Sequence, residues 1–165
     1  HLFSRNGDPL EAIVGTLLRE RKATLSIAES CTGGMAGERI TSVAGSSDYF
    51  LGGFVTYTDR MKTDLLGVDP NLIAQHTAVS KEVARAMAES ARARTGSTFA
   101  VSITGEAGPE SGSGAPVGTI FVGFAGPDEP AEALRFAMPG DRPRIRGFAT
   151  QAALDLLRRR LLKLD

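Results

Sequence analysis

The chain of 165 residues has no tryptophan, two tyrosines, two histidines and a single cysteine. One cysteine excludes an internal disulfide and a cysteine-based metal cluster. The scarcity of aromatic side chains leaves little surface on which nucleic-acid bases could stack. Positive charge is not in excess either, because 19 Lys and Arg residues balance 19 Asp and Glu residues. A neutral chain exerts no long-range attraction on nucleic acid or an anionic membrane, and we expect neither as a partner.

Long apolar runs are also missing. None approaches the ~18 residues that a transmembrane helix needs, and the first residues lack the pattern of a secretory signal peptide. These absences, with the single cysteine, predict a cytoplasmic protein. A hydrophobic content of 42% and a charged content of 23% are normal for a globular protein of one domain. We expect residues 8–165 to form that domain and residues 1–7 to be a linker or an expression remnant.

Helix and strand signals alternate along the chain. Asp8-Pro9-Leu10-Glu11 has the features of a helix start, with an acidic N-cap and a proline in the first turn. Helices are predicted from there and at 34–43, 59–66, 80–96 and 141–163. Strands are predicted at 24–29, 50–57, 99–103, 119–125 and 131–138, with a bulge at Gly52-Gly53. The alternation, with a hairpin near the end, indicates an α/β domain of three layers with a mixed sheet.

The segment Glu29-Ser30-Cys31-Thr32-Gly33-Gly34 joins a predicted strand to a predicted helix. A hydroxyl at such a turn is well placed to act as a nucleophile, and the two glycines let a substrate approach the backbone closely. The N–H groups at the helix start favour an oxyanion or a phosphate. The alternative is a glycine-rich turn that only leads into a packed helix.

A nucleophilic Ser30 needs a base. His76 is the only histidine beyond the first residue, and it is predicted to lie in a polar connection. Lys62 is the other candidate, because a buried amine loses its proton more easily. Tyr57 could then hydrogen-bond both Lys62 and Ser30. The competing interpretation makes Lys62 a solvated helix residue and Tyr57 a strand-end aromatic.

Cys31 is the rival nucleophile, although its place next to Ser30 favours a buried, inert thiol. Thr32 could hydrogen-bond a helix end or a substrate amide. Asp59, Asp64, Asp69 and His76 lack the spacing of metal ligands, so we expect no metal site.

Ligands in open α/β sheets bind beyond the carboxyl ends of strands. The loops that follow predicted strands cover 29–34, 57–62, 104–118 and 138–146. The 104–118 loop is not a P-loop, since no Gly-Lys-Ser/Thr follows its glycines. Arg142, Arg144 and Arg146 cluster where the last helix begins, which suits either a phosphate or a solvated basic face.

Taken together, these segments resemble the CinA C-terminal domain family, which includes nicotinamide mononucleotide deamidases of the PncC type. The resemblance covers about residues 8–162, in family order. The matching segments are Ala28-Glu29-Ser30-Cys31-Thr32-Gly33-Gly34, Ala44-Gly45-Ser46-Ser47, Gly53-Phe54-Val55-Thr56-Tyr57-Thr58, Lys62, Leu66-Gly67-Val68, Ala78-Val79-Ser80, Thr104-Gly105, Ala107-Gly108-Pro109, Pro116-Val117-Gly118-Thr119 and Gly140-Asp141-Arg142.

The resemblance implies a three-layer αβα domain with a five-stranded mixed β-sheet. It also implies hydrolysis of the carboxamide of nicotinamide mononucleotide to nicotinate mononucleotide and ammonia, as in pyridine nucleotide recycling, without a cofactor. The catalytic group is a serine assisted by lysine and tyrosine, here Ser30, Lys62 and Tyr57. The substrate-binding residues that we expect are Thr32, Gly33, Gly34, Ser46, Thr104, Gly105 and Arg142.

Four residues depart from the family pattern: Glu106, Thr77, Ala115 and Asp59 stand where an apolar residue, Gly, Lys and Asn are usual. None removes a proposed catalytic group, although Glu106 and Ala115 alter the loop nearest the substrate.

The opening residues 2–9 resemble a connector that follows another domain. We therefore expect an N-terminal partner domain in a longer chain, and a homo-oligomer, with a dimer favoured. The alternative function is a non-catalytic module that binds a nucleotide or a partner within a larger competence-associated protein. Neutral charge disfavours a third possibility, a nucleic-acid-binding domain linked to DNA uptake.

Overall fold

The computed structural model describes residues 7–163, so the predicted linker lies almost wholly outside the described residues. One five-stranded sheet has the order β2-β1-β3-β4-β5. The strands are β1 (Leu25–Glu29), β2 (Phe50–Val55), β3 (Phe99–Gly105), β4 (Thr119–Ala125) and β5 (Glu132–Ala137). β1 is parallel to both β2 and β3, whereas β4 is antiparallel to β3 and β5. The predicted mixed sheet is therefore confirmed.

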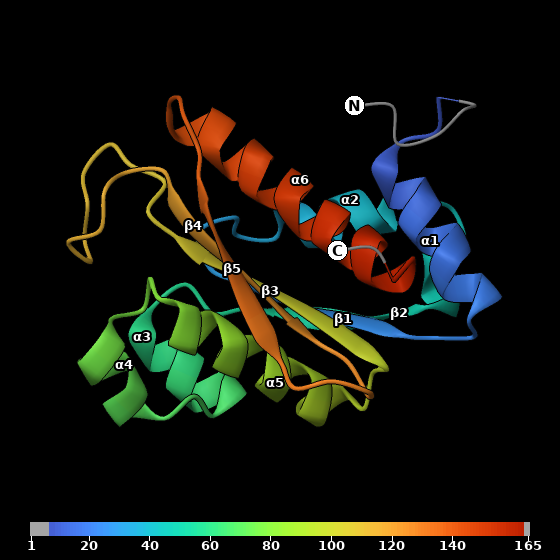
Figure 1. The fold of residues 1–165 in the computed structure, drawn as a ribbon, viewed down its shortest axis with the longest axis horizontal. Helices are drawn as coiled ribbons and strands as arrows, with labels where there is room; N and C mark the ends of the chain where they lie inside the picture. The colour runs from blue at the N-terminus through green and yellow to red at the C-terminus, as the bar shows by residue number, and fades with distance from the viewer. Residues whose placement is uncertain (1–6, 164–165) are drawn as a thin grey trace.

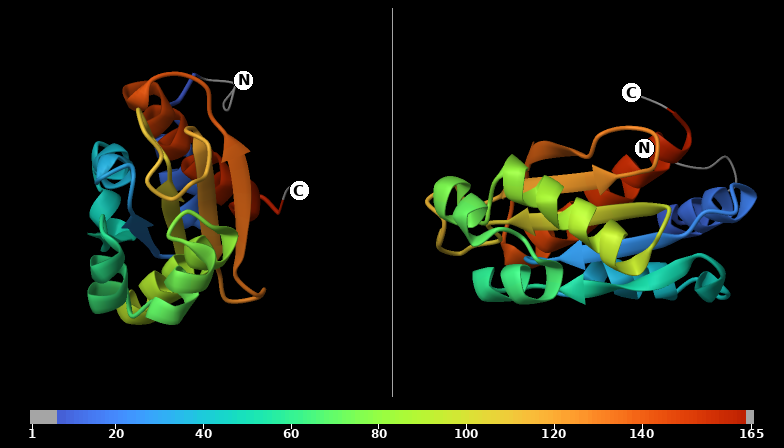
Figure 2. Two further views of the ribbon diagram at one scale, coloured as in Figure 1. Left: turned by 90° about the vertical axis from the view of Figure 1, so that its left-hand side faces the viewer. Right: turned by 90° about the horizontal axis from the view of Figure 1, so that it is seen from below.

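Helices cover both faces of the sheet (Figure 1). One layer holds α1 (Leu10–Glu20), α2 (Met35–Thr41) and α6 (Arg142–Leu161), which pack against one another. The other layer holds α3 (Asp59–Met61), α4 (Pro70–His76) and α5 (Lys81–Thr95). The right-hand view of Figure 2 shows this second layer from below, with α5 lying over the strands. The arrangement confirms the three-layer α/β fold.

Each layer buries its own hydrophobic core against the sheet. Leu10, Val14 and Leu18 of α1 recur at helical spacing and are at most 3% exposed, in the core shared with α6. Val83 and Met87 of α5 are fully buried in the second core. Full burial of such a side chain contributes about 1.5–3 kcal/mol, so the apolar faces stabilise the layers on the sheet.

The structure has one helix that the sequence did not predict, α4, and it divides the helix predicted at 59–66 into two turns. α4 begins with Asp69 as N-cap, whose carboxylate accepts from Asn71 N–H at 2.8 Å, and with Pro70 at its first position. His76 therefore ends a helix rather than lying in a polar connection. The helix predicted at 59–66 is a turn of α-helix followed by a π-helical turn, Lys62–Leu66. β2 has a register shift against β1, but the shift passes over Leu51, and the predicted bulge residues Gly52 and Gly53 pair regularly with Ser26 and Ile27.

Strand direction gathers four loops at one edge of the sheet. β4 alone runs opposite to the other strands, so the carboxyl ends of β1, β2, β3 and β5 lie at the same edge. The loops that leave those ends begin at Ser30, Thr56, Glu106 and Met138. This edge is the place where the fold predicts a ligand site. No helix within residues 7–163 has the length and apolarity to span a bilayer.

Candidate active site

Ser30 is the first residue after β1. Its N–H donates to the carbonyl of Ile103 at 2.9 Å, which ties the turn to the neighbouring strand β3. Gly33 and Gly34 follow with φ of 59° and 102°, values that L residues with a side chain rarely adopt. The two glycines therefore turn the chain into α2 directly behind Ser30, whose side chain is buried (7% exposed).

Lys62 approaches Ser30 from the π-helical turn. Its Nζ lies 3.1 Å from Ser30 Oγ and 3.1 Å from the carbonyl oxygen of Thr56, and the residue is 1% exposed. Burial lowers the pKa of the Lys62 ammonium below its ordinary value of 10.5, and the opposing effect of Asp59 is smaller. Single π-helical turns are frequent at functional sites. The contact expected of a serine–lysine pair is thus present, and its amine is inclined toward the neutral form.

Tyr57 lies at the rim of the site and not between Ser30 and Lys62. Its side chain is 55% exposed, and its hydroxyl accepts a hydrogen bond from Arg142 Nη2 at 2.7 Å. The prediction that Tyr57 hydrogen-bonds both catalytic partners is wrong for this structure. The reason is that β2 ends at Val55 and the next residue, Thr56, turns its side chain into the interior, which leaves Tyr57 facing outward.

Cys31 and His76 are poor alternatives to the serine–lysine pair. Burial raises the pKa of the Cys31 thiol to about 12, with a smaller contribution from the carboxylate of Glu29. A thiol with that pKa supplies almost no thiolate at neutral pH. His76 ends α4, where its Nδ1 lies 3.7 Å from Glu82 Oε2, and it does not line the pocket that holds Ser30.

A pocket of about 520 Å³ opens in front of Ser30 and Lys62. Its walls come from the carboxyl edge of the sheet, the α4–α5 connection and Ile73 of α4. Residues lining it include Ser30, Cys31, Tyr57, Asp59, Lys62, Ala78, Thr104, Gly105, Glu106, Gly108 and Arg142. Its volume lies in the range of small-molecule sites.

The helix start behind Ser30 is already occupied by a protein carboxylate. Glu29 accepts hydrogen bonds from the N–H groups of Gly34, Ala36 and Gly37, at 3.1, 3.1 and 2.9 Å. The Gly33 N–H donates to Ser30 O at 3.0 Å. The amides of Gly33 and Gly34, which were expected among the substrate-binding groups, therefore already have protein acceptors.

Within residues 7–163, two amides of the turn lack an acceptor in another residue. Among the described residues, the N–H groups of Cys31 and Thr32 donate to no backbone or side-chain acceptor of another residue. Thr32 contributes its hydroxyl to Glu29 at 2.6 Å, so this side chain supports a helix end, one of the roles expected for it.

Two arginines of the predicted cluster, Arg142 and Arg146, have different roles. Arg146 donates to the carbonyls of Cys31 and Thr32 at 3.0 and 2.8 Å, so it holds the nucleophile turn and is not a solvated residue. Arg142 reaches the pocket, where it donates to Gly108 O at 2.7 Å and to the Tyr57 hydroxyl. Only Arg142 of these two faces the cavity.

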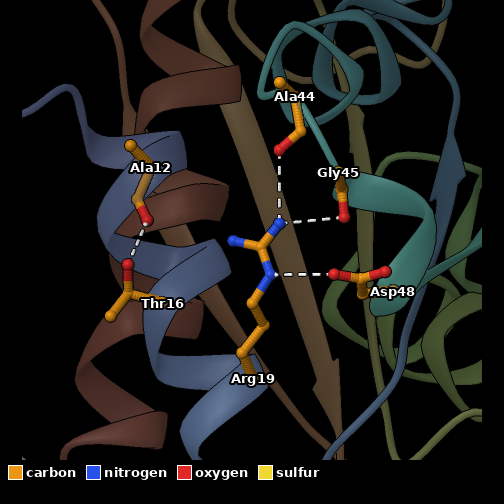
Figure 3. Close-up of polar contacts among 6 residues, drawn as sticks. All are labelled: Ala12, Thr16, Arg19, Ala44, Gly45 and Asp48. Carbon is orange, nitrogen blue, oxygen red and sulfur yellow. Dashed lines mark hydrogen bonds and ion pairs between the residues drawn. The ribbon is translucent and has the colours of Figure 1, made fainter.

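Ser46 does not belong to this site. It lies in a short 3₁₀ turn, Ser46–Asp48, that precedes β2, at the edge of the sheet opposite to Ser30. Figure 3 shows Arg19 of α1 bound to Ala44 O, Gly45 O and Asp48 in this turn. The prediction that Ser46 assists substrate binding within the same chain is wrong, because the turn opens a strand rather than following one.

The loop at 106–118 forms one wall of the pocket, together with Thr104 and Gly105 at the end of β3. The Thr104 hydroxyl donates to Ala78 O at 2.8 Å. Glu106 is buried, and its carboxylate accepts from the N–H groups of Gly112 and Ser113 at 3.2 and 2.7 Å. Burial raises the pKa of Glu106, but a hydrogen bond from the Ser113 side chain and those from the two N–H groups outweigh burial and leave the pKa lowered. Glu106 thus closes its own loop as an ionised group.

Thr77 also has a structural consequence. Its φ of 65° lies in the left-handed region, where a β-branched residue is strained and glycine is not. The usual glycine at this position therefore has a backbone reason. No group of three or more His, Cys, Asp or Glu side chains within the described part of the chain is arranged to hold a metal ion.

Sequence reasoning singled out Ser30, Lys62 and Arg142 but assigned no role to Glu29. The available signal was a glutamate that ends a strand whose five residues are all buried. A buried carboxylate needs hydrogen-bond donors, and the helix start that follows supplies them.

The fold and the buried serine–lysine pair define an α/β domain with a candidate hydrolytic site at the strand ends. A family model described as the CinA C-terminal domain matches residues 7–161. The chain therefore belongs to the CinA C-terminal domain family, as the sequence motifs predicted.

Individual relatives agree with this assignment. The chain is 56% identical over 161 residues to a CinA-like protein of Solibacter usitatus, covering 97% of this chain and 38% of the relative. It thus spans about two-fifths of the length of such curated relatives. A competence damage-inducible protein A structure from Klebsiella pneumoniae has a TM-score of 0.90 at 30% identity, covering 94% of this chain and 97% of that one. For the CihA structure from Agrobacterium tumefaciens the TM-score is 0.85 at 34% identity, with 95% and 96% covered.

Proposed function

We propose that this domain is an amidohydrolase that deamidates nicotinamide mononucleotide to nicotinate mononucleotide and ammonia. The observation that carries the proposal is the buried pair of Ser30 Oγ and Lys62 Nζ, 3.1 Å apart, at the floor of the pocket. A hydroxyl paired with an amine of lowered pKa has the elements of an activated nucleophile. The substrate follows from the family resemblance.

In the proposed reaction, neutral Lys62 takes the proton from Ser30 Oγ as this oxygen attacks the carboxamide carbon. The N–H groups of Cys31 and Thr32 stabilise the negative charge that develops on the amide oxygen. Lys62 then gives its proton to the departing nitrogen, which leaves as ammonia. Water attacks the resulting acyl-serine, again with Lys62 as base, and releases the carboxylate product.

Arg142 is the proposed phosphate contact. Its guanidinium carries five N–H donors, and Gly108 O and the Tyr57 hydroxyl are its protein acceptors. The remaining donors are available to a phosphate at the rim of the pocket. Tyr57 acts in this scheme by holding Arg142, and not by relaying a proton. The chemistry requires no metal and no organic cofactor.

Incubation of the purified protein with nicotinamide mononucleotide tests the proposal, with ammonia and nicotinate mononucleotide measured in parallel. We expect both products in equal amounts from the wild type and neither from Ser30→Ala. If nicotinamide mononucleotide binds but neither product forms, the proposal fails. The domain then serves as a non-catalytic nucleotide-binding module, in keeping with relatives more than twice its length.

A further inference from the structure

Glu29 has a buried carboxylate whose hydrogen bonds all come from the turn that follows Ser30 and from the start of α2. The residue is 1% exposed, and its carboxylate accepts from the Thr32 hydroxyl at 2.6 Å in addition to three amides of α2. Those amides form the positive end of the helix, which stabilises a carboxylate. Ser30, the next residue, turns its hydroxyl toward Lys62 instead.

The turn is therefore held by its neighbours on two sides. The Glu29 carboxylate accepts from the Thr32 hydroxyl and from amides at the start of α2. Arg146 donates to the carbonyls of Cys31 and Thr32. Among residues 7–163, the amides of Cys31 and Thr32 donate to no acceptor of another residue. An N–H pair next to a nucleophile is the arrangement that binds the oxyanion in acyl transfer.

We propose that Glu29 is a positioning residue for this site: its carboxylate fixes the turn so that Ser30 meets Lys62 and the amides of Cys31 and Thr32 stay free for the oxyanion. This inference rests on the proposed amidohydrolase function. The same carboxylate closes the start of α2 to other anions, so the substrate phosphate binds elsewhere. Its charge also helps to keep the Cys31 thiol protonated, which reserves the nucleophilic role for serine.

Glu29→Gln tests the inference, because it keeps the shape of the side chain while removing the charge. The new NH₂ group faces a backbone N–H that needs an acceptor, so at least one of the four hydrogen bonds is lost. We expect kcat to fall by about 10- to 100-fold with KM nearly unchanged, since the interaction supports the transition state more than ground-state binding. The matched control is Glu38→Gln, an exposed glutamate in the first turn of the same helix. It removes the same charge without touching the turn, and its kcat is expected to stay at the wild-type value.

A second readout does not depend on the nucleotide. The rate at which phenylmethanesulfonyl fluoride modifies Ser30, followed by mass spectrometry, reports the reactivity of the serine itself. We expect this rate to fall in Glu29→Gln and to be unchanged in Glu38→Gln. If the wild type does not deamidate nicotinamide mononucleotide but labelling still slows in Glu29→Gln, the proposed function fails and the positioning role stands. A wild-type Ser30 that reacts no faster than the exposed Ser111 overturns both.

Thr32 provides variants that perturb the turn less, should Glu29→Gln fold poorly. Thr32→Val preserves the shape of a fully buried side chain and removes only the 2.6 Å hydrogen bond to Glu29. Thr32→Ser keeps the hydroxyl. We expect Thr32→Val to lower kcat and the labelling rate, and Thr32→Ser to retain both. Wild-type values of kcat and labelling in Thr32→Val, or in a folded Glu29→Gln, would overturn the inference.

Discussion

Two turns of this molecule are built alike and lie at opposite edges of the sheet. In each, one arginine from a helix donates to two consecutive backbone carbonyls: Arg146 in the turn at 30–34 and Arg19 in the turn at 44–48. Each turn also contains a buried serine, with Ser30 7% exposed and Ser46 9% exposed. Neither the arginine contacts nor burial of the serine therefore sets the candidate nucleophile apart.

The difference lies in what faces the serine. Ser30 meets the buried amine of Lys62, whereas the described structure gives Ser46 no lysine partner. The ion pair of the second turn joins Arg19 to Asp48, and both of these side chains are substantially exposed. A turn held by an arginine is thus a general structural device. It becomes a candidate catalytic site only where strand direction brings a buried base and a pocket to the same edge.

The comparison of the two turns predicts its largest change in turnover for Ser30→Ala. We expect turnover of nicotinamide mononucleotide to fall by about 10³-fold or more, since only binding and oxyanion contributions remain. Ser46→Ala, the matched change in the other turn, should leave kcat near the wild-type value, as should Cys31→Ala. Rates of ammonia release by the three purified variants measure the contrast. A normal rate in Ser30→Ala combined with inactivity in Cys31→Ala would reverse the assignment of the nucleophile.

The next effect concerns the buried amine. A guanidinium keeps its proton at any working pH, so Lys62→Arg should lose about 10²- to 10⁴-fold in turnover, the usual contribution of a general base. In the wild type, kcat/KM should rise with pH along a limb that lies below pH 10.5, because burial lowers the pKa of Lys62. A Lys62→Arg enzyme that keeps most of its rate would show that Lys62 supplies positive charge only.

The lowered pKa of Lys62 also has a consequence for stability. Between the folded-state pKa and the ordinary value of 10.5, the unfolded chain binds more protons at this residue than the folded chain does. The Lys62 contribution to the free energy of unfolding therefore rises with pH through this interval. Urea unfolding at several pH values should show this increment in the wild type and lose it in Lys62→Met.

A smaller effect is expected on substrate binding, which the proposal places at the edge of the sheet that holds Ser30 and Arg142. Charge-assisted hydrogen bonds to a phosphate contribute about 1.5–3 kcal/mol, so Arg142→Ala should raise KM for nicotinamide mononucleotide by about 10- to 100-fold. The phosphate-free riboside should be affected much less. If the variant weakens both substrates equally, Arg142 acts by holding Tyr57 and Gly108, and the phosphate is bound elsewhere.

The parts of the fold that follow from periodicity and caps could be predicted from sequence. Ser80 is the N-cap of α5 and Asp141 that of α6, and both accept from a backbone N–H of the first turn. The serine–lysine contact could also be predicted, because both residues follow strands that end at one edge. Helix caps and apolar periodicity were sufficient wherever a single helix or strand determined the position of a residue.

The rest depended on which way side chains turn at the strand ends. The positions of Tyr57 and Ser46 follow from where β2 ends and begins, and one residue of difference reverses the face of a side chain. The role of Glu29 depends on donors from the following helix that only the folded turn brings together. α4 was missed because its cap, Asp69-Pro70, lies only a few residues after the preceding helical turn.

The smallest effects are expected from Arg19→Ala and Arg146→Ala, which remove the arginine contact that the two turns have in common. Arg19→Ala breaks exposed contacts, so we expect a loss of about 1 kcal/mol in the free energy of unfolding and an unchanged kcat. Arg146→Ala frees the carbonyls next to the Cys31 and Thr32 amides, so the oxyanion donors become less ordered. We expect a similar loss of stability together with a fall in kcat of about tenfold, since displacement of a single donor is enough to weaken transition-state binding. Urea unfolding and ammonia release, measured on the same preparations, separate the two quantities. If the two variants lose equal stability and neither loses activity, the arginine is only a structural support in both turns.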